Sequence, residues 1–131
     1  MKTIYTILLA TVIAASLGCG YSKKMQPPVA GVMPTISQLN PNDVTHGGAG
    51  FTLTVDGTNF LTNAVVNWNG AAQATTYVSS KQLTVTIPAS MIATAGSAQV
   101  TVTNPATMGS GMYGGGGTMA ETSAPITFTI Q

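Results

Sequence analysis

Few side chains in this sequence of 131 residues could carry chemistry. There are one histidine, one cysteine, three carboxylates and four lysines, and there is no arginine. His46 lies three residues after Asp43, but no Gly-x-Ser-x-Gly motif accompanies the pair. A nucleophilic triad needs a serine or cysteine, a histidine and a carboxylate held in contact. We therefore interpret His46 as a turn residue and predict that the chain is not an enzyme.

The three carboxylates, Asp43, Asp56 and Glu121, are widely separated along the chain. Glycosidases need two facing carboxylates, and calcium-binding loops need a dense run of acidic residues. Neither pattern is present. A single cysteine forms no internal disulfide, and it makes no zinc site without a cluster of Cys and His. We predict no catalytic residue, no metal site and no cofactor.

Charged residues make up 5% of the chain and hydrophobic residues 44%. A globular protein usually carries about 25% charged residues, and here Thr, Ser, Asn, Gln and Gly take their place. Nucleic-acid binding needs clustered Lys and Arg that displace counterions from phosphates. The cations of this chain are Lys2, Lys23, Lys24 and Lys81. We therefore predict that it binds no nucleic acid.

Residues 1–18 have the pattern of a signal peptide. Lys2 supplies a positive start, residues 4–15 are predominantly apolar, and small residues follow at Ser16 and Gly18. The apolar run is shorter than the roughly 20 residues that a membrane-spanning helix needs. The protein is therefore predicted to be exported rather than held by a permanent transmembrane helix.

Cys19 directly follows this segment, and the run from Ser16 to Cys19 resembles the lipobox of bacterial lipoproteins. Gly18 matches the small residue before the cysteine in that family, whereas Ser16 stands where an aliphatic residue is usual. The resemblance implies that the Cys19 sulfur is diacylated and anchors the protein to a membrane of the cell envelope. The alternative is ordinary signal-peptidase cleavage, which would release a secreted, soluble protein.

Residues 19–33 are predicted to form a flexible linker behind the lipid-attachment cysteine. Pro27-Pro28 favours an extended polyproline II backbone, and no alternating apolar pattern appears before Pro34. The predicted organisation is therefore a signal peptide at 1–18, the cysteine and linker at 19–33, and one folded domain at 34–131.

From Pro34 onward, apolar and polar residues alternate as they do in half-buried strands. In the clearest run, residues 51–56, Phe, Leu and Val alternate with Thr and Asp. Such one-sided strands bury their apolar faces when two sheets pack together. The predicted fold is an all-β sandwich with a turn at 89–94. Seven strands are predicted, at 35–39, 51–56, 64–68, 75–79, 83–88, 100–103 and 126–131.

The segment from Pro34 to Pro41, Gly47-Gly48 and the run Gly57-Thr58-Asn59-Phe60 resemble the opening of an IPT/TIG domain. The likeness continues through Ile87-Pro88 and residues 100–104 and spans 34–131. It implies an immunoglobulin-like sandwich of the kind found in receptors and bacterial surface proteins. Independently, Gly57 and Asn59 are predicted to take a left-handed backbone, and Phe60 to fold back as an apolar plug.

Residues 105–123 form a Gly-rich insertion before the last strand, longer than a usual hairpin connection. Its candidate binding residues are Met108, Met112, Tyr113 and Met119. We expect this loop to be mobile. It is interpreted as a low-complexity insertion or as a partner-binding loop; a thioether site for Cu(I) is less well supported because no tight Met-x-x-Met cluster is present.

Carbohydrate binding is a further hypothesis, because aromatic rings stack on sugars while amides bind hydroxyl groups. The candidate residues are Trp68, Asn67, Asn69, Tyr77 and Tyr113. The domain has few aromatic side chains and a core to fill, so packing is the favoured role for them, Trp68 included.

These observations predict a non-catalytic module of the bacterial cell envelope that mediates protein interaction or assembly. Its partners would be the membrane, through a lipid on Cys19, and an unknown protein or glycan. A sheet edge without charged residues also predicts self-association by strand pairing, so a secreted self-assembling subunit is an alternative.

Overall fold

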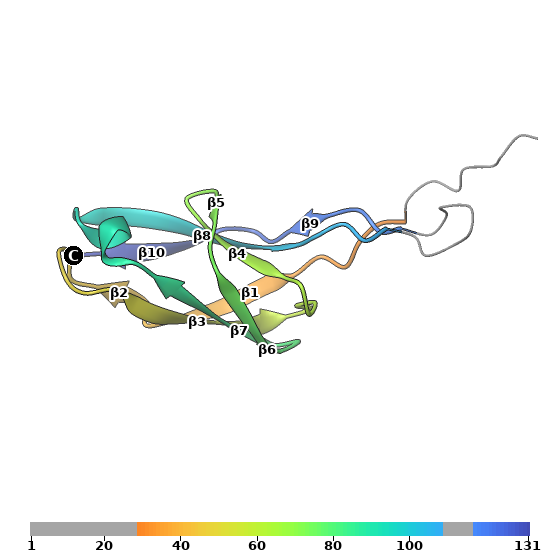
Figure 1. Ribbon diagram of the computed structural model, residues 1–131, viewed down its shortest axis with the longest axis horizontal. Helices are drawn as coiled ribbons and strands as arrows, with labels where there is room; N and C mark the ends of the chain where they lie inside the picture. Colours follow the sequence, from red (N-terminus) through yellow and green to blue (C-terminus); the bar gives the residue numbers. More distant parts are fainter. Residues whose placement is uncertain (1–28, 109–116) are drawn as a thin grey trace, which may run out of the picture.

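The computed structural model describes residues 29–108 and 117–131, which form two stacked β-sheets (Figure 1). The prediction of an all-β, immunoglobulin-like sandwich is confirmed. The predicted turn at 89–94 contains a short 3-10 helix, η2 (Ala89–Ile92).

The first sheet has four antiparallel strands in the order β1-β3-β7-β6. Threonines on β3 and β7 lie opposite each other, for example Thr54 and Thr84, while Leu53 and Val85 face the core. β-branched and apolar residues in alternation suit such half-buried strands. The strands are β1 (Thr35–Asn40), β3 (Phe51–Thr58), β7 (Gln82–Ile87) and β6 (Thr75–Ser79).

The second sheet has the order β2-β10-β8-β4-β5, and β9 pairs with β8 beyond the start of β10. β2 pairs in parallel with the end of β10, and the other pairs are antiparallel. The strands are β2 (Asp43–Val44), β4 (Val65–Trp68), β5 (Ala71–Ala72), β8 (Gly96–Asn104), β9 (Glu121–Thr122) and β10 (Ile126–Ile130).

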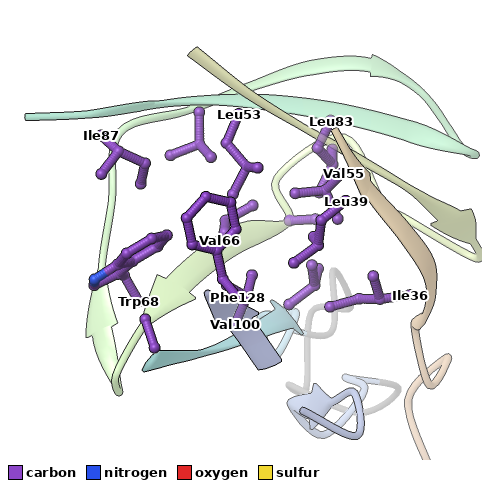
Figure 2. Close-up of a cluster of buried hydrophobic side chains, with 14 of the residues drawn as sticks. Ile36, Leu39, Leu53, Val55, Val66, Trp68, Leu83, Ile87, Val100 and Phe128 are labelled. Carbon is purple, nitrogen blue, oxygen red and sulfur yellow. The ribbon is translucent and has the colours of Figure 1, made fainter. Parts of the chain in front are cut away.

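The side chains between the sheets form one hydrophobic core (Figure 2). Phe128 lies at its centre, with its ring centroid 5.1 Å from that of Trp68 and 5.6 Å from that of Phe51. Leu53, Val66 and Val100 are fully buried around them. Alternation along each strand directs these residues inward and the threonines outward.

The turn Gly57-Thr58-Asn59-Phe60 confirms two of three local predictions. Asn59 has a φ of 63°, so its backbone is left-handed, and Phe60 is 2% exposed. Gly57 is not left-handed, and that prediction is wrong. It is needed because a Cβ atom there would collide with the Thr35 carbonyl oxygen and the Phe60 ring.

Asn104, at the end of β8, is a buried polar residue that joins three segments. Its Nδ2 donates to the carbonyl oxygens of Val32 at 2.7 Å and Asn59 at 2.8 Å. Its Oδ1 accepts from the Leu61 N–H at 3.2 Å. The side chain thus ties the segment before β1 and the turn after β3 to the second sheet.

Residues 29–33, within the predicted linker, pack along the end of the sandwich. The Val29 N–H donates to the Gly117 oxygen, and the Val29 oxygen accepts from the Met119 N–H, both at 3.0 Å. A Cβ atom on Gly31 would collide with the Met119 carbonyl oxygen. Figure 1 shows this orange segment beside the blue arms at one end of the domain, with β2 at the other end.

The two arms of the Gly-rich loop are paired. Thr107 and Thr118 exchange two backbone hydrogen bonds of 3.0 and 3.1 Å, and their hydroxyl groups lie 2.8 Å apart. β9 then continues along β8, with Thr122 opposite Thr103. Hydrogen bonds therefore join the two arms at Thr107 and Thr118, and the expectation that the loop is mobile stays a prediction.

Candidate binding surfaces

Trp68 belongs to the core rather than to a binding surface. It ends β4, is 3% exposed and packs against Phe128. Figure 2 shows the indole among the buried aliphatic side chains. A sugar cannot stack on a ring that both sheets cover, so the hypothesis that Trp68 binds carbohydrate is corrected here in favour of packing.

Asn67 contributes to an uncharged polar row on the outer face of the second sheet. Its Nδ2 donates to the hydroxyl oxygens of Thr103 at 2.9 Å and Thr101 at 3.3 Å. The Thr103 and Thr122 hydroxyl groups are 2.9 Å apart and extend the row onto β9. These groups satisfy one another, so Asn67 first of all connects neighbouring strands.

Asn69 stabilises the turn after β4, because both its side chain and its backbone are hydrogen-bonded. Its backbone is left-handed, with a φ of 51°. Its Oδ1 accepts from the Gln99 N–H at 2.8 Å, and its own N–H donates to the Gln99 oxygen at 2.9 Å. These bonds fix the turn against β8.

Tyr77 does not lie beside Asn67 and Asn69. It is on β6, at the edge of the first sheet, whereas they lie on or next to β4 in the second sheet. It is 37% exposed, and its neighbour Val78 is 52% exposed. β6 pairs with β7 alone and contains no charged residue. This edge is therefore an uncharged surface with free backbone groups.

Met108 and Met119 lie on the two paired arms of the Gly-rich loop and are 96% and 54% exposed. Val29, Val32 and Met33 are also exposed at this end of the domain. The remaining candidates, Cys19, Met112 and Tyr113, lie outside the described residues. The candidate binding residues that the structure describes lie in separate places and do not form one site.

Sequence reasoning missed an open groove between β1 of the first sheet and β10 of the second. Its volume is about 420 Å³, within the roughly 300–1,000 Å³ typical of ligand clefts. No charged side chain lines it. The lining residues are Ser37, Gln38, Leu39, Asn40, Asn42, Ile126 and Thr127.

The ionisable residues considered for catalysis bind backbone or amide groups at separate places. His46 Nδ1 lies 2.7 Å from the Gln131 oxygen, and Asp43 accepts from the Gln131 amide at 2.7 Å. Asp56 accepts from the Gln82 amide at 3.0 Å. Across residues 29–108 and 117–131, no cluster of three or more His, Cys, Asp or Glu is placed to hold a metal ion.

The same described ranges contain no helix long and apolar enough to cross a membrane.

Residues 34–129 match the family model of the IPT/TIG domain. This match covers most of the chain and nearly all of the sandwich. Domains of this family are immunoglobulin-like modules that take part in protein interaction in general and are typically non-catalytic. No curated protein and no solved structure matches the chain.

Proposed function

The chain belongs to the IPT/TIG domain family, and from this premise we propose that it is a non-catalytic protein-interaction module of the bacterial cell envelope, tethered by a lipid on Cys19. The observations that carry the interaction role are the uncharged edge strand β6 and the first part of β10, which β2 does not cover. Such edges bind other strands through main-chain hydrogen bonds.

The place where the chain enters the domain supports the tether. The orange segment that begins at residue 29 lies at one end of the sandwich, and β2 and the C-terminus lie at the other (Figure 1). Cys19 precedes Val29 by ten residues, so an extended spacer would reach at most about 33–36 Å. A membrane anchored at that end would leave the edges of both sheets accessible to partners.

Site-specific photo-crosslinking in intact cells tests the interaction role. A photoreactive amino acid is placed in the full chain at Tyr77, Met119 or Thr127, each on a different exposed surface, and at the exposed bend residue Thr94 as the matched control. We expect a discrete crosslinked species from at least one of the three surfaces and none from Thr94. The absence of a discrete species at all three positions would contradict the proposal.

Self-assembly is a second candidate, favoured by the exposed edge of β6. From Thr76 to Ser79 every residue of this strand is exposed, and little charge opposes the pairing of two copies. A register shift between Tyr77 and Ser79 interrupts the strand, however, and such irregularities disfavour edge-to-edge pairing. In the crosslinking experiment, self-assembly predicts a species at twice the mass of the chain from the probe at Tyr77.

Carbohydrate binding has weaker support. The polar row around Asn67 could bond to hydroxyl groups, but Trp68, the one tryptophan, is buried behind it. Tyr77 is on the other sheet. The described residues therefore do not combine an exposed aromatic ring with this polar row.

A further inference from the structure

The groove between β1 and β10 lies where the chain crosses from one sheet to the other. β1 ends at Asn40 in the first sheet, and β2 begins at Asp43 in the second sheet. β2 covers the edge of β10 along Thr129 and Ile130. The preceding part of that edge, from Ile126 to Thr127, faces the groove.

The hydrogen bonds of β2 show which backbone groups point into this groove. The Thr129 N–H donates to the Asn42 oxygen at 3.4 Å, and the Gln131 N–H donates to the Val44 oxygen at 2.8 Å. Alternate residues of a strand direct their N–H and C=O groups to the same edge. The N–H and C=O of Thr127 therefore point toward the same edge, one step before the part that β2 covers.

The pairing of β2 with β10 begins at Thr129 and does not extend back to Thr127. Continued in the same register, it would bond the Thr127 N–H to the Asn40 oxygen and the Thr127 oxygen to the Asn42 N–H. Neither bond belongs to a β-ladder of the described residues, in which β10 pairs with β8 and, from Thr129 onward, with β2. The groove occupies the place where the missing strand would lie.

The lining of the groove defines the chemistry of its occupant. The lining combines residues with hydroxyl or amide side chains with two apolar residues, Leu39 and Ile126, and includes no charged residue. The polar lining residues are Ser37, Gln38, Asn40, Asn42 and Thr127. A charged ligand group would lose hydration there without gaining an opposite charge. Extended peptide advances about 3.3 Å per residue, so a groove of about 420 Å³ accommodates a few residues of an uncharged strand.

We propose that this groove binds an extended, uncharged peptide segment of a partner protein, which adds to the edge of β10 by pairing with the backbone of Thr127. This inference rests on the proposed interaction function and identifies the site that performs it. β10 is favoured over β6 because Thr127 lines a groove, whereas β6 has an irregular register.

Amide exchange and peptide titration test this site in the full, ¹⁵N-labelled chain. The probe is an acetylated and amidated pentapeptide of alternating threonine and valine, which has no charge. We expect the probe to slow exchange of the Thr127 N–H at least about tenfold, while the Phe128 N–H, which points to the opposite edge, changes little. This measurement needs no substitution.

Two substitutions at one position separate the backbone donor from the side chain. Thr127→Pro removes the N–H that faces the groove, and proline is tolerated at strand edges. Thr127→Ala keeps the N–H and removes the hydroxyl group that accepts from Gln99 Nε2 at 3.1 Å. We expect Thr127→Pro to weaken probe binding at least about tenfold and Thr127→Ala to change it less than about twofold.

Three outcomes would overturn the inference. The first is that the probe does not bind. The second is that the probe slows amide exchange on β6 instead of at Thr127. The third is that exchange at Thr127 slows as the protein concentration rises without any probe, which would make a second copy of the chain the occupant. If the wild-type chain does not bind the peptide but the probe at Tyr77 or Met119 gives a discrete crosslink in cells, the groove assignment fails while the interaction function stands. If none of the three positions gives a crosslink in cells, the proposed function fails.

Discussion

Replacing Asn104 with alanine is expected to lower the free energy of unfolding by about 3–5 kcal/mol. The substitution leaves the carbonyl oxygens of Val32 and Asn59 and the N–H of Leu61 without their side-chain partner. Asn104 itself is 1% exposed and these three bonds are partly buried, and a polar group that loses its partner in such a place costs about 1–3 kcal/mol. Because Asn104 joins three segments, the end of the domain nearest Val29 should loosen first.

Denaturant unfolding of the wild type and the variant measures this effect. Asn67→Ala is the matched control, because Asn67 also bonds to two residues, Thr101 and Thr103, but on the outer face of the second sheet. We expect that control to cost less than about 1 kcal/mol, since water can replace its partners. Equal losses in the two variants would show that Asn104 does not join the segments as described.

Replacing Trp68 with alanine is expected to cost about 3–5 kcal/mol, the usual range for removing a large aromatic side chain from a core. The indole is 3% exposed and packs on Phe128. Its removal leaves a cavity between the sheets that the rigid strands cannot fill. Tyr77→Ala is the comparison variant, because Tyr77 is exposed on β6. This substitution should change the free energy of unfolding by no more than about 0.5 kcal/mol.

Thermal or denaturant unfolding followed by far-UV circular dichroism measures both variants. The fluorescence of the wild type gives an independent check, because Trp68 is the one tryptophan. Its emission should shift to longer wavelength when the protein unfolds. A Trp68→Ala chain that kept its stability and lost retention on a glycan would contradict the core position and restore the carbohydrate hypothesis.

The fold could be predicted because the alternation of apolar residues is strong in long strands. In β3 and β7, threonine alternates with fully buried leucine, valine or isoleucine, so strand and inward face are both evident. β2, β5 and β9 were not predicted, because two residues are too few to show alternation. β8 begins at Gly96, earlier than predicted, because the one buried side chain before Val100 is the small Ala98, which gives a weak apolar signal.

The candidate site was less accessible to sequence reasoning, because it depends on strand pairing. Thr127 resembles the other outward threonines in the sequence, and its place in the groove follows from where β2 starts along β10. Gly57 was predicted to have a left-handed backbone, but a glycine is needed there because the Thr35 backbone approaches too closely to leave room for a side chain. The fate of Cys19 rests on the sequence alone and stays a prediction.

The most direct test of the proposed tethered interaction module is intact mass spectrometry of the membrane and soluble fractions of a bacterial host. It compares the wild type with Cys19→Ser, which differs by one atom at the predicted attachment point. We predict that the wild type is found in the membrane fraction, begins at Cys19 and carries a diacylglycerol-sized mass increment that Cys19→Ser lacks. A wild-type chain found soluble and unmodified would contradict the tether and favour a secreted binding or self-assembling subunit.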